Sequence, residues 1–322
     1  MSYLQGKQVL VTGATGLVGV NLLLRLVSSG ARIRATVHHK GAVINDPAIE
    51  YVTADLTDKN ACVRVTSGID IVFHCAANTQ GAAVIAKSPL AHVTPNIVMN
   101  AQLLEAAYHA GVGKFVWIGS STGYPDTGAR PVAEDEMMLG DPYDTYFGVG
   151  WMKRYTEVLC RLYGEKLNPT MTTIVLRATN IYGPYDDFNF ETSHVLPALI
   201  RKGIERMAPF EVWGTGDDVR DLIYVTDFVD AMLLAVEKLD RHTCLNIGYG
   251  QGYSVKEMLG FVLQATGYDD AEVLYNRSRP SMIPVRLVTT DKAEQVIGFR
   301  ASTGIKEGIS KTVAWYRDTY PT

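Results

Sequence analysis

The chain contains little cysteine and no metal-binding cysteine pattern. Its four cysteines, Cys62, Cys75, Cys160 and Cys244, are scattered, and no two have the CxxC spacing of a zinc site or a redox motif. Scattered cysteines of this kind are typical of reduced thiols in the cytoplasm, where disulfides are rare. We therefore expect a cytoplasmic protein without a disulfide framework and without a metal site.

Long apolar runs and dense basic runs are also absent. No stretch is apolar over the roughly 20 residues that a bilayer-spanning helix needs, and the first residues lack the charged-then-apolar pattern of a signal peptide. The formal net charge is -4, and no Lys/Arg run stands out. These features argue against a membrane and against nucleic acid as partners. A hydrophobic content of 47% is ordinary for a globular protein, and the length suits one large or two modest domains.

A glycine motif near the N-terminus is the most specific pattern in the chain. Residues 9–11 predict a short buried strand and residues 17–26 predict a helix, with Gly13, Gly16 and Gly19 at the spacing GxxGxxG. Gly13 permits a tight turn, Gly16 lets the backbone approach a pyrophosphate, and Gly19 lets the helix pack closely on the strand. The helix N-terminus attracts phosphate. The expected cofactor contacts here are Gly13, Thr15, Gly16, Leu17, Val18 and Gly19.

Strands and helices alternate along the rest of the chain. The sequence predicts strands at residues 31–37, 51–56, 69–77, 114–118, 172–176 and 244–247, and helices at 96–107, 195–202 and 225–237. This alternation predicts an α/β fold with a doubly wound parallel sheet that binds ligands at the carboxyl ends of its strands. We expect a dinucleotide-binding part over residues 1–178, to which 225–249 return, and a smaller α/β substrate-binding part over 179–322.

The end of the predicted second strand bears on the choice between NAD and NADP. A carboxylate there would bind the adenosine ribose hydroxyls and favour NAD, but the strand is followed by His38, His39 and Lys40. Basic and hydrogen-bonding groups suit a 2′-phosphate, so we expect NADP, with NAD as the alternative and a solvated basic loop as the competing interpretation. Further expected cofactor contacts at strand ends are Asp55, Leu56, Ala76, Ala77 and Ala178.

Six segments spread over nearly the whole chain form a set. They are VTGATGLVG, GSSTGYP, KRYTE, NIYGP, VWGTGDDVRDLIYVTD and LNIGYG. The set resembles the extended short-chain dehydrogenase/reductase family, of the epimerase/dehydratase type. Within that family, GSSTGYP, NIYGPYDDF, SHVLPALIRK and VWGTG look most like segments of the GDP-fucose synthases. The resemblance implies a Rossmann fold, a nucleotide-sugar substrate, reductase or epimerase activity, and a homodimer formed through the helix that bears Lys153.

The resemblance also implies catalytic roles. The family uses a tyrosine as the proton donor and a Ser or Thr hydroxyl. A lysine four residues after the tyrosine lowers the pKa of that tyrosine and binds the nicotinamide ribose of the cofactor. Ser120 matches the hydroxyl and Lys153 matches the lysine, but Val149 stands where the tyrosine is expected. Valine cannot donate a proton. Either a rearranged Tyr146 or Tyr143 serves instead, or the tyrosine has been replaced and a weakly active binder remains, or the family register does not hold here.

Other matched positions concern proton exchange and substrate binding. His194 matches an acid/base histidine of the GDP-fucose synthases, and an unperturbed histidine pKa near 6.5 suits proton exchange beside a ketone. Thr122 stands where those enzymes have a second base, a cysteine; threonine is a poor base, which favours simple ketoreduction, oxidation or single epimerisation. A 4-epimerase with tightly held NAD is the alternative enzyme. The expected nucleotide-sugar contacts are Asn180, Lys202, Trp213, Arg220 and Arg279.

Overall fold

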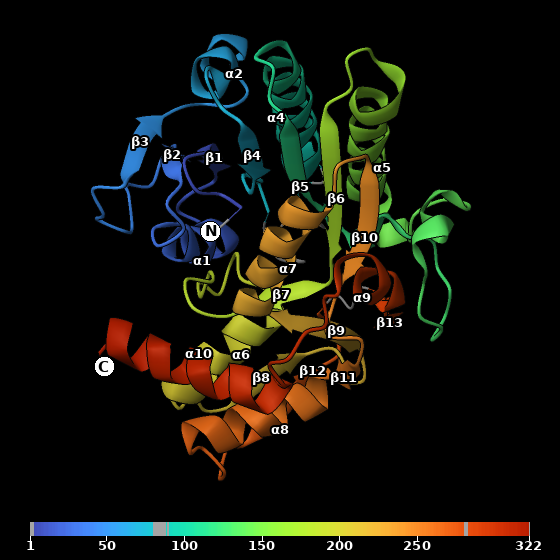
Figure 1. The fold of residues 1–322 in the computed structure, drawn as a ribbon. Coiled ribbons are helices and arrows are strands. Elements are labelled where there is room, and N and C mark those ends of the chain that lie inside the picture. The colour runs from blue at the N-terminus through green and yellow to red at the C-terminus, as the bar shows by residue number, and fades with distance from the viewer. Residues whose placement is uncertain (1–2, 80–87, 89, 280–282, 322) are drawn as a thin grey trace.

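A parallel sheet lies at the centre of the larger part of the molecule (Figure 1). The computed structural model describes residues 3–79, 88, 90–279 and 283–321. Within them the large sheet has seven parallel strands in the order β10-β6-β5-β4-β1-β2-β3. These are β1 (Gln8–Thr12), β2 (Arg32–Val37), β3 (Ile49–Thr53), β4 (Ile71–His74), β5 (Lys114–Ser120), β6 (Thr172–Ala178) and β10 (Thr243–Ile247). The strand order reverses between β1 and β4, which opens a ligand crevice at their carboxyl ends.

Helices cover both faces of this sheet (Figure 1). One face packs on α1 (Leu17–Leu26), α7 (Val225–Lys238) and α9 (Asp291–Ile297), and the other on α2 (Lys59–Thr66), α4 (Leu90–His109) and α5 (Phe147–Arg161). In β1, Val9 and Val11 join the first core and Leu10 joins the second. A strand buried on both faces needs an unbroken apolar run, which is why residues 9–11 are all apolar.

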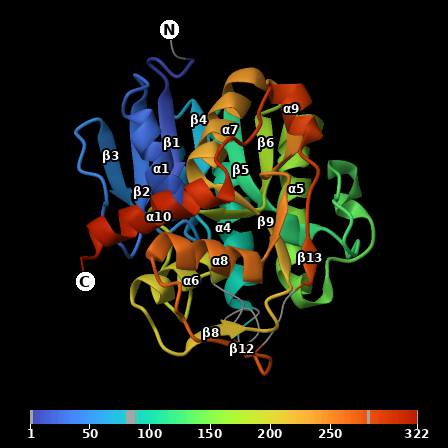
Figure 2. The same ribbon diagram turned by 90° about the horizontal axis from the view of Figure 1, so that it is seen from below.

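A second group of elements lies below the large sheet in Figure 1 and in front of it in Figure 2. Its helices are α6 (Val195–Ile204), α8 (Val255–Thr266) and α10 (Ile305–Thr319). Strand β9 (Val219–Tyr224) pairs with β7 (Asn180–Tyr182), β11 (Gly252–Ser254) and β13 (Val285–Arg286), while β8 (Phe210–Trp213) pairs with β12 (Val273–Asn276). We call these elements the lower layer. They enclose a core of their own, which includes Leu199, Met258 and Ile309.

Buried carboxylates join the lower layer to segments that leave the large sheet. Asp221 on β9 accepts hydrogen bonds from the backbone N–H groups of Tyr249 and Gly250, which follow β10. Asp227 on α7 accepts hydrogen bonds from the N–H groups of Ser302 and Thr303. Because both carboxylates are buried, these bonds are costly to lose, and they fix the lower layer beneath the carboxyl edge of the sheet.

Several predicted boundaries are wrong by a few residues. Strand β3 ends at Thr53 rather than 56, because the Asp55 carboxylate accepts hydrogen bonds from the N–H and hydroxyl groups of Thr57 and turns the chain. Strand β4 ends at His74 rather than 77, and β5 and β6 each run two residues further than predicted. Helix α4 begins at Leu90, six residues before the predicted start. Among helices built from described residues, none combines the length and apolar character needed to cross a bilayer.

Candidate active site

The glycine turn is shaped by close contacts between loops. Gly13 has a φ of 66°, and a Cβ on it would lie 2.7 Å from the Cα of Ala76 in the loop after β4. A Cβ on Gly19 would collide with the carbonyl oxygen of Gly13. Gly16, the N-cap of α1, has open space around it, with Gly13 O at 3.6 Å from an added Cβ. The turn therefore fits a pyrophosphate, which would meet open backbone at Gly16 and the N–H groups of the first turn of α1.

The expected adenosine end lies where β2 and β3 terminate. The rings of His38 and His39 lie 3.7 Å apart between centroids, and these residues and Lys40 are exposed. Hydrogen bonds from Thr57 lower the pKa of the neighbouring Asp55, and His38 and His39 lower it further. The basic side chains after β2 and the Asp55 carboxylate after β3 therefore lie at the same edge of the sheet. Leu56, in contrast, is buried in the core beneath α2.

The hydroxyls at the end of β5 are ordered by each other. Ser120 Oγ accepts hydrogen bonds from the Thr122 N–H group at 3.2 Å and from Thr122 Oγ1 at 2.9 Å. Ser120 therefore caps the one-turn helix η1 (Ser121–Gly123), and the hydroxyl proton of Thr122 is committed to Ser120. Because Ser120 acts as acceptor in both bonds, its own proton can be donated to a substrate oxygen.

Lys153 reaches the end of β5 from helix α5. Its Nζ donates a hydrogen bond to Ile118 O at 3.1 Å and lies 4.8 Å from the centroid of the Trp117 ring. Burial lowers the pKa of Lys153 to about 8, against the opposing effect of Glu157. Glu157, one turn further along, accepts hydrogen bonds from Arg177 Nε at 3.0 Å and Nη2 at 2.7 Å. This buried pair fixes α5 against β6 and so positions the lysine.

The turn of α5 before Lys153 contains no tyrosine. Val149 is half-buried there, and Tyr146 precedes the helix as its N-cap. Burial raises the pKa of Tyr146, while the nearby Arg220 and Arg286 of the lower layer lower it. The Tyr146 phenol is therefore close enough to these two arginines to interact with them.

Two glycines before Lys153 do not interrupt helix α5. Helix α5 is continuous from Phe147 to Arg161 and includes Gly148 and Gly150. A Cβ on Gly150 would lie 2.5 Å from Pro142 Cβ and 2.9 Å from Thr122 O. Glycine is needed because the helix passes close to the loop that bears Thr122. Tyr143, the other candidate donor, is the N-cap of the short helix η3 (Asp144–Tyr146).

His194 is the N-cap of α6 and its side chain is exposed. The surrounding protein desolvates the ring and lowers its pKa, the nearby Asp187 opposes this shift, and His92 adds to it. His92, on the first turn of α4, is itself buried, and its Nε2 has no hydrogen-bond partner among the described residues. A histidine with a lowered pKa is mainly neutral at physiological pH and can accept a proton.

Three of the expected substrate contacts meet at one corner of the lower layer. Lys202 Nζ donates a hydrogen bond to Glu211 O at 2.6 Å, and the Arg279 guanidinium lies 5.0 Å from the centroid of the Trp213 ring. Sequence reasoning missed Glu211, whose carboxylate lies 3.9 Å from Arg279 Nε and accepts a hydrogen bond from Asn276. Cations beside an indole ring suit a nucleotide with a diphosphate.

The other two expected contacts, Asn180 and Arg220, lie on β7 and β9. Asn180 Nδ2 donates a hydrogen bond to Asp221 O at 3.1 Å. Arg220 forms an ion pair with Asp218 at 3.3 Å and is paired in register with Arg286 on β13. The five expected contacts are thus divided between two places in the lower layer.

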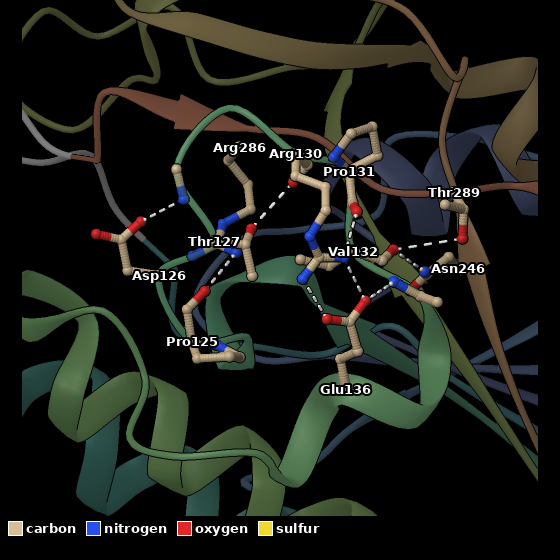
Figure 3. A network of polar contacts seen from close by, with 12 residues as sticks. Pro125, Asp126, Thr127, Arg130, Pro131, Val132, Glu136, Asn246, Arg286 and Thr289 are labelled. Carbon is tan, nitrogen blue, oxygen red and sulfur yellow. Dashed lines mark hydrogen bonds and ion pairs between the residues drawn. The ribbon is translucent and has the colours of Figure 1, made fainter.

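Arg286 is a further residue that sequence reasoning missed. It is buried, and its Nη1 donates a hydrogen bond to Pro125 O (Figure 3). Its Nη2 donates a hydrogen bond to Tyr124 O. The same loop continues to Arg130 and Glu136, whose side chains form a bidentate ion pair in Figure 3. The lower layer therefore holds the loop that directly follows the Ser120 and Thr122 hydroxyls.

The remaining expected contacts lie at the carboxyl edge of the sheet. Ala76 and Ala77 follow β4 beside the glycine turn, and Ala178 is buried at the end of β6. All four cysteines are free thiols. In the part of the chain that the structure describes, no cluster of three or more His, Cys, Asp or Glu side chains could hold a metal ion.

Comparison with known proteins identifies the class to which this fold and site belong. The model of the NAD dependent epimerase/dehydratase family matches residues 9–248, and the chain belongs to that family. The family resemblance inferred from the motifs and the predicted fold class are thereby confirmed.

Individual relatives cover nearly the whole chain. A GDP-L-fucose synthase of Sinorhizobium fredii is 26% identical over 318 residues, 97% of this chain and 96% of that one. A dTDP-4-dehydro-6-deoxy-D-allose reductase of Streptomyces sp is 28% identical over 326 residues, 97% of each chain. The crystal structure of a UDP-glucose 4-epimerase from Thermotoga maritima, solved with UDP-glucose, is similar with a TM-score of 0.87 and 26% identity, over 97% of this chain and 99% of that one.

Proposed function

We propose that this protein is an NAD(P)-dependent enzyme that reduces or epimerises a keto-deoxy sugar linked to a nucleotide. The observation that carries the proposal is the position of Lys153, whose Nζ binds Ile118 O at the end of β5. Ser120 ends the same strand, Thr122 follows it in η1, and the glycine turn lies at the same edge of the sheet. Family membership and the relatives' names support the same chemistry.

The dinucleotide would lie across the carboxyl ends of β1 and β4. Its pyrophosphate would meet Gly16 and the first turn of α1, and its nicotinamide ribose would meet Lys153. When bound, the dinucleotide supplies or removes the hydride. We propose NADP because His38, His39 and Lys40 are exposed at the adenosine end; NAD stays the alternative because Asp55 is close to the same histidines.

The nucleotide sugar would bind between the lower layer and the sheet. Lys202 and Arg279 would bind its diphosphate from the corner around Glu211, with Trp213 against the nucleotide, and Arg220 would approach it separately from β9. Ser120 would donate a hydrogen bond to the sugar oxygen, since Thr122 leaves its proton available. His194 would accept or return a proton at the neighbouring carbon. The first substrate to test is a GDP-linked 4-keto-6-deoxy sugar, with dTDP- and UDP-linked sugars alongside.

Two alternatives rest on specific observations. The similarity to a UDP-glucose 4-epimerase supports an enzyme that oxidises and then re-reduces the same carbon. Val149 in the tyrosine position supports a nucleotide-sugar binder with little turnover. A 4-epimerase would be purified with cofactor bound and would consume none of it, and a binder would hold both ligands without changing either.

A turnover assay separates these possibilities. The protein is incubated with each keto sugar and NADPH or NADH, and loss of absorbance of the reduced cofactor is followed, with mass spectrometry of the sugar. We expect consumption of NADPH in preference to NADH, and a Lys153→Met control that binds the sugar but turns it over far more slowly. Fluorescence titration measures both affinities, and either equal or tighter binding of NADH than of NADPH, or an unchanged preference in His38→Asp, would contradict the cofactor assignment.

We further propose two parts in the chain and a homodimer in solution. Residues 1–178 with 225–249 would form the dinucleotide-binding part and 179–322 the remaining substrate-binding part. Exposed apolar side chains follow one face of α5 and of the residue after it, at Phe147, Trp151, Tyr155, Val158 and Leu162. Spacings of three and four residues place them on one side of the helix, where a second copy of the chain would cover them. A cytoplasmic location is proposed from the free thiols.

A further inference from the structure

A chain of buried hydrogen bonds runs from strand β1 to helix α5. Thr12 Oγ1 lies 2.7 Å from His74 Nδ1, and His74 Nε2 lies 2.9 Å from Asn100 Oδ1. Asn100 Nδ2 donates to Thr156 Oγ1 at 3.1 Å, and Thr156 Oγ1 donates to the backbone carbonyl of Met152 at 3.0 Å. The four residues are at most 3% exposed. They come from four elements, β1, β4, α4 and α5.

The direction of the chain follows from its two ends. The Ala76 N–H group donates to Thr12 Oγ1 at 3.1 Å, so the Thr12 proton is available for His74 Nδ1. His74 then carries its proton on Nε2 and donates it to Asn100, whose amide N–H donates onward to Thr156. The opposite direction would take the Thr156 proton away from the Met152 carbonyl. Burial also lowers the pKa of His74 to about 4, so the ring is neutral at physiological pH.

The ends of the chain lie beside two parts of the proposed cofactor site. Thr12 immediately precedes Gly13, and Ala76 touches Gly13 so closely that a Cβ on Gly13 would lie 2.7 Å from it. Met152 immediately precedes Lys153, whose Nζ binds Ile118 O. A shift at either end would leave a buried polar group without its partner, which is costly inside a protein. The two ends are therefore held in one relative position.

We propose that His74, Asn100 and Thr156 are positioning residues that couple the phosphate-binding turn to the turn of α5 bearing Lys153. The proposal rests on the proposed function, because it assigns the cofactor to both ends of the chain. It predicts that a change at Thr156, on α5, weakens binding at the glycine turn through the intervening side chains.

A double-mutant cycle tests this coupling. NADPH affinity is measured by fluorescence titration for Thr12→Val, Thr156→Val and the double variant, with Thr12→Ser as the conservative replacement. Independent distant sites add, whereas linked residues show coupling. We expect each Val variant to weaken NADPH binding by roughly threefold or more. The double variant should bind NADPH nearly as well as whichever single variant binds it less tightly. Thr12→Ser, which keeps the hydroxyl, should bind nearly as well as the parent chain.

Thr173 provides the matched control. Its hydroxyl is fully buried on β6 and donates to Cys160 O at 2.7 Å. Thr173 takes no part in the series of hydrogen bonds from Thr12 to Thr156. Thr173→Val should leave NADPH affinity unchanged and combine additively with Thr12→Val. Additive effects for both pairs, or unchanged affinity in Thr156→Val, would overturn the proposal.

A second measurement does not depend on cofactor binding. Nitrogen NMR of His74 should show a neutral ring protonated at Nε2 near neutral pH, and this state should be lost in Thr12→Val and in Asn100→Leu. The unfolding free energies of the same variants form a second cycle, in which Thr12→Val and Thr156→Val should again be coupled. A charged His74 ring, a ring protonated at Nδ1 or additive unfolding free energies would contradict the proposed series of hydrogen bonds. If the parent protein binds neither NADPH nor NADH, the proposed function fails. The NMR and unfolding measurements still test whether the hydrogen bonds link Thr12 to Thr156.

Discussion

At the scale of single residues, the position of Val149 has the largest consequence. General acid catalysis contributes about 10²- to 10⁴-fold to rates, and valine has no proton to give. Val149→Tyr should raise turnover of the correct keto sugar by roughly that factor, because Lys153 is already in place one turn later. Tyr146→Phe in the parent chain should change turnover little, since Tyr146 precedes α5 as its N-cap and does not occupy the position one turn before Lys153. Loss of a healthy activity in Tyr146→Phe, with no gain in Val149→Tyr, would make Tyr146 the acid.

The pKa of Lys153 also makes stability depend on pH. That pKa is about 8 in the folded protein, against about 10.4 for an unperturbed lysine. Between these values the unfolded chain binds more protons than the folded one. This lysine therefore makes the free energy of unfolding rise with pH from about 8 to about 10.4, and it causes no further rise above that range. Urea unfolding across this range should show that rise in the parent chain and a flatter profile in Lys153→Met. Parallel profiles would show that the folded pKa is not depressed.

At the scale of elements, the apolar face of α5 leads to a test of assembly. Val158 is 50% exposed on that face, and Val63 on α2 is 53% exposed elsewhere. Val158→Glu should convert a dimer to a monomer in light scattering, because it places a charge where the second copy would pack. Val63→Glu is the matched control and should stay dimeric. A parent chain that is already monomeric at micromolar concentration would contradict the proposed interface.

Elements with a local signal were predictable, and elements formed by pairing were not. The run at residues 9–11 and the periodic apolar residues of 17–26 predicted β1 and α1, because burial on fixed faces demands those patterns. Strand β13 has two residues and exists through its pairing with β9, so no pattern announces it. The same limit applies to the site. Lys153 could be predicted from a sequence motif, whereas Arg286 and Glu211 are positioned by the pairing of strands that are distant in the sequence.

At the scale of the whole molecule, the two proposed ligands use different layers, so their binding should be separable by mutation. Gly16→Val places methyl groups where the pyrophosphate would pass and should abolish dinucleotide binding. Nucleotide-sugar binding, which depends on the lower layer, should persist in that variant. Isothermal titration with NADPH and with the nucleotide diphosphate sugar gives both affinities for one preparation.

The reciprocal variants complete the test. Lys202→Met and Arg279→Met each remove a cation from the corner around Glu211 and Trp213. Hydrogen bonds to charged groups contribute about 1.5–3 kcal/mol, so each variant should weaken nucleotide-sugar binding roughly 10- to 100-fold and leave NADPH affinity unchanged. Both affinities falling together in Lys202→Met, with the fold intact by circular dichroism, would mean that the ligands share one site. Separate losses would instead agree with a reaction at the boundary between the layers, where the Ser120 and Thr122 hydroxyls directly precede the loop held by Arg286.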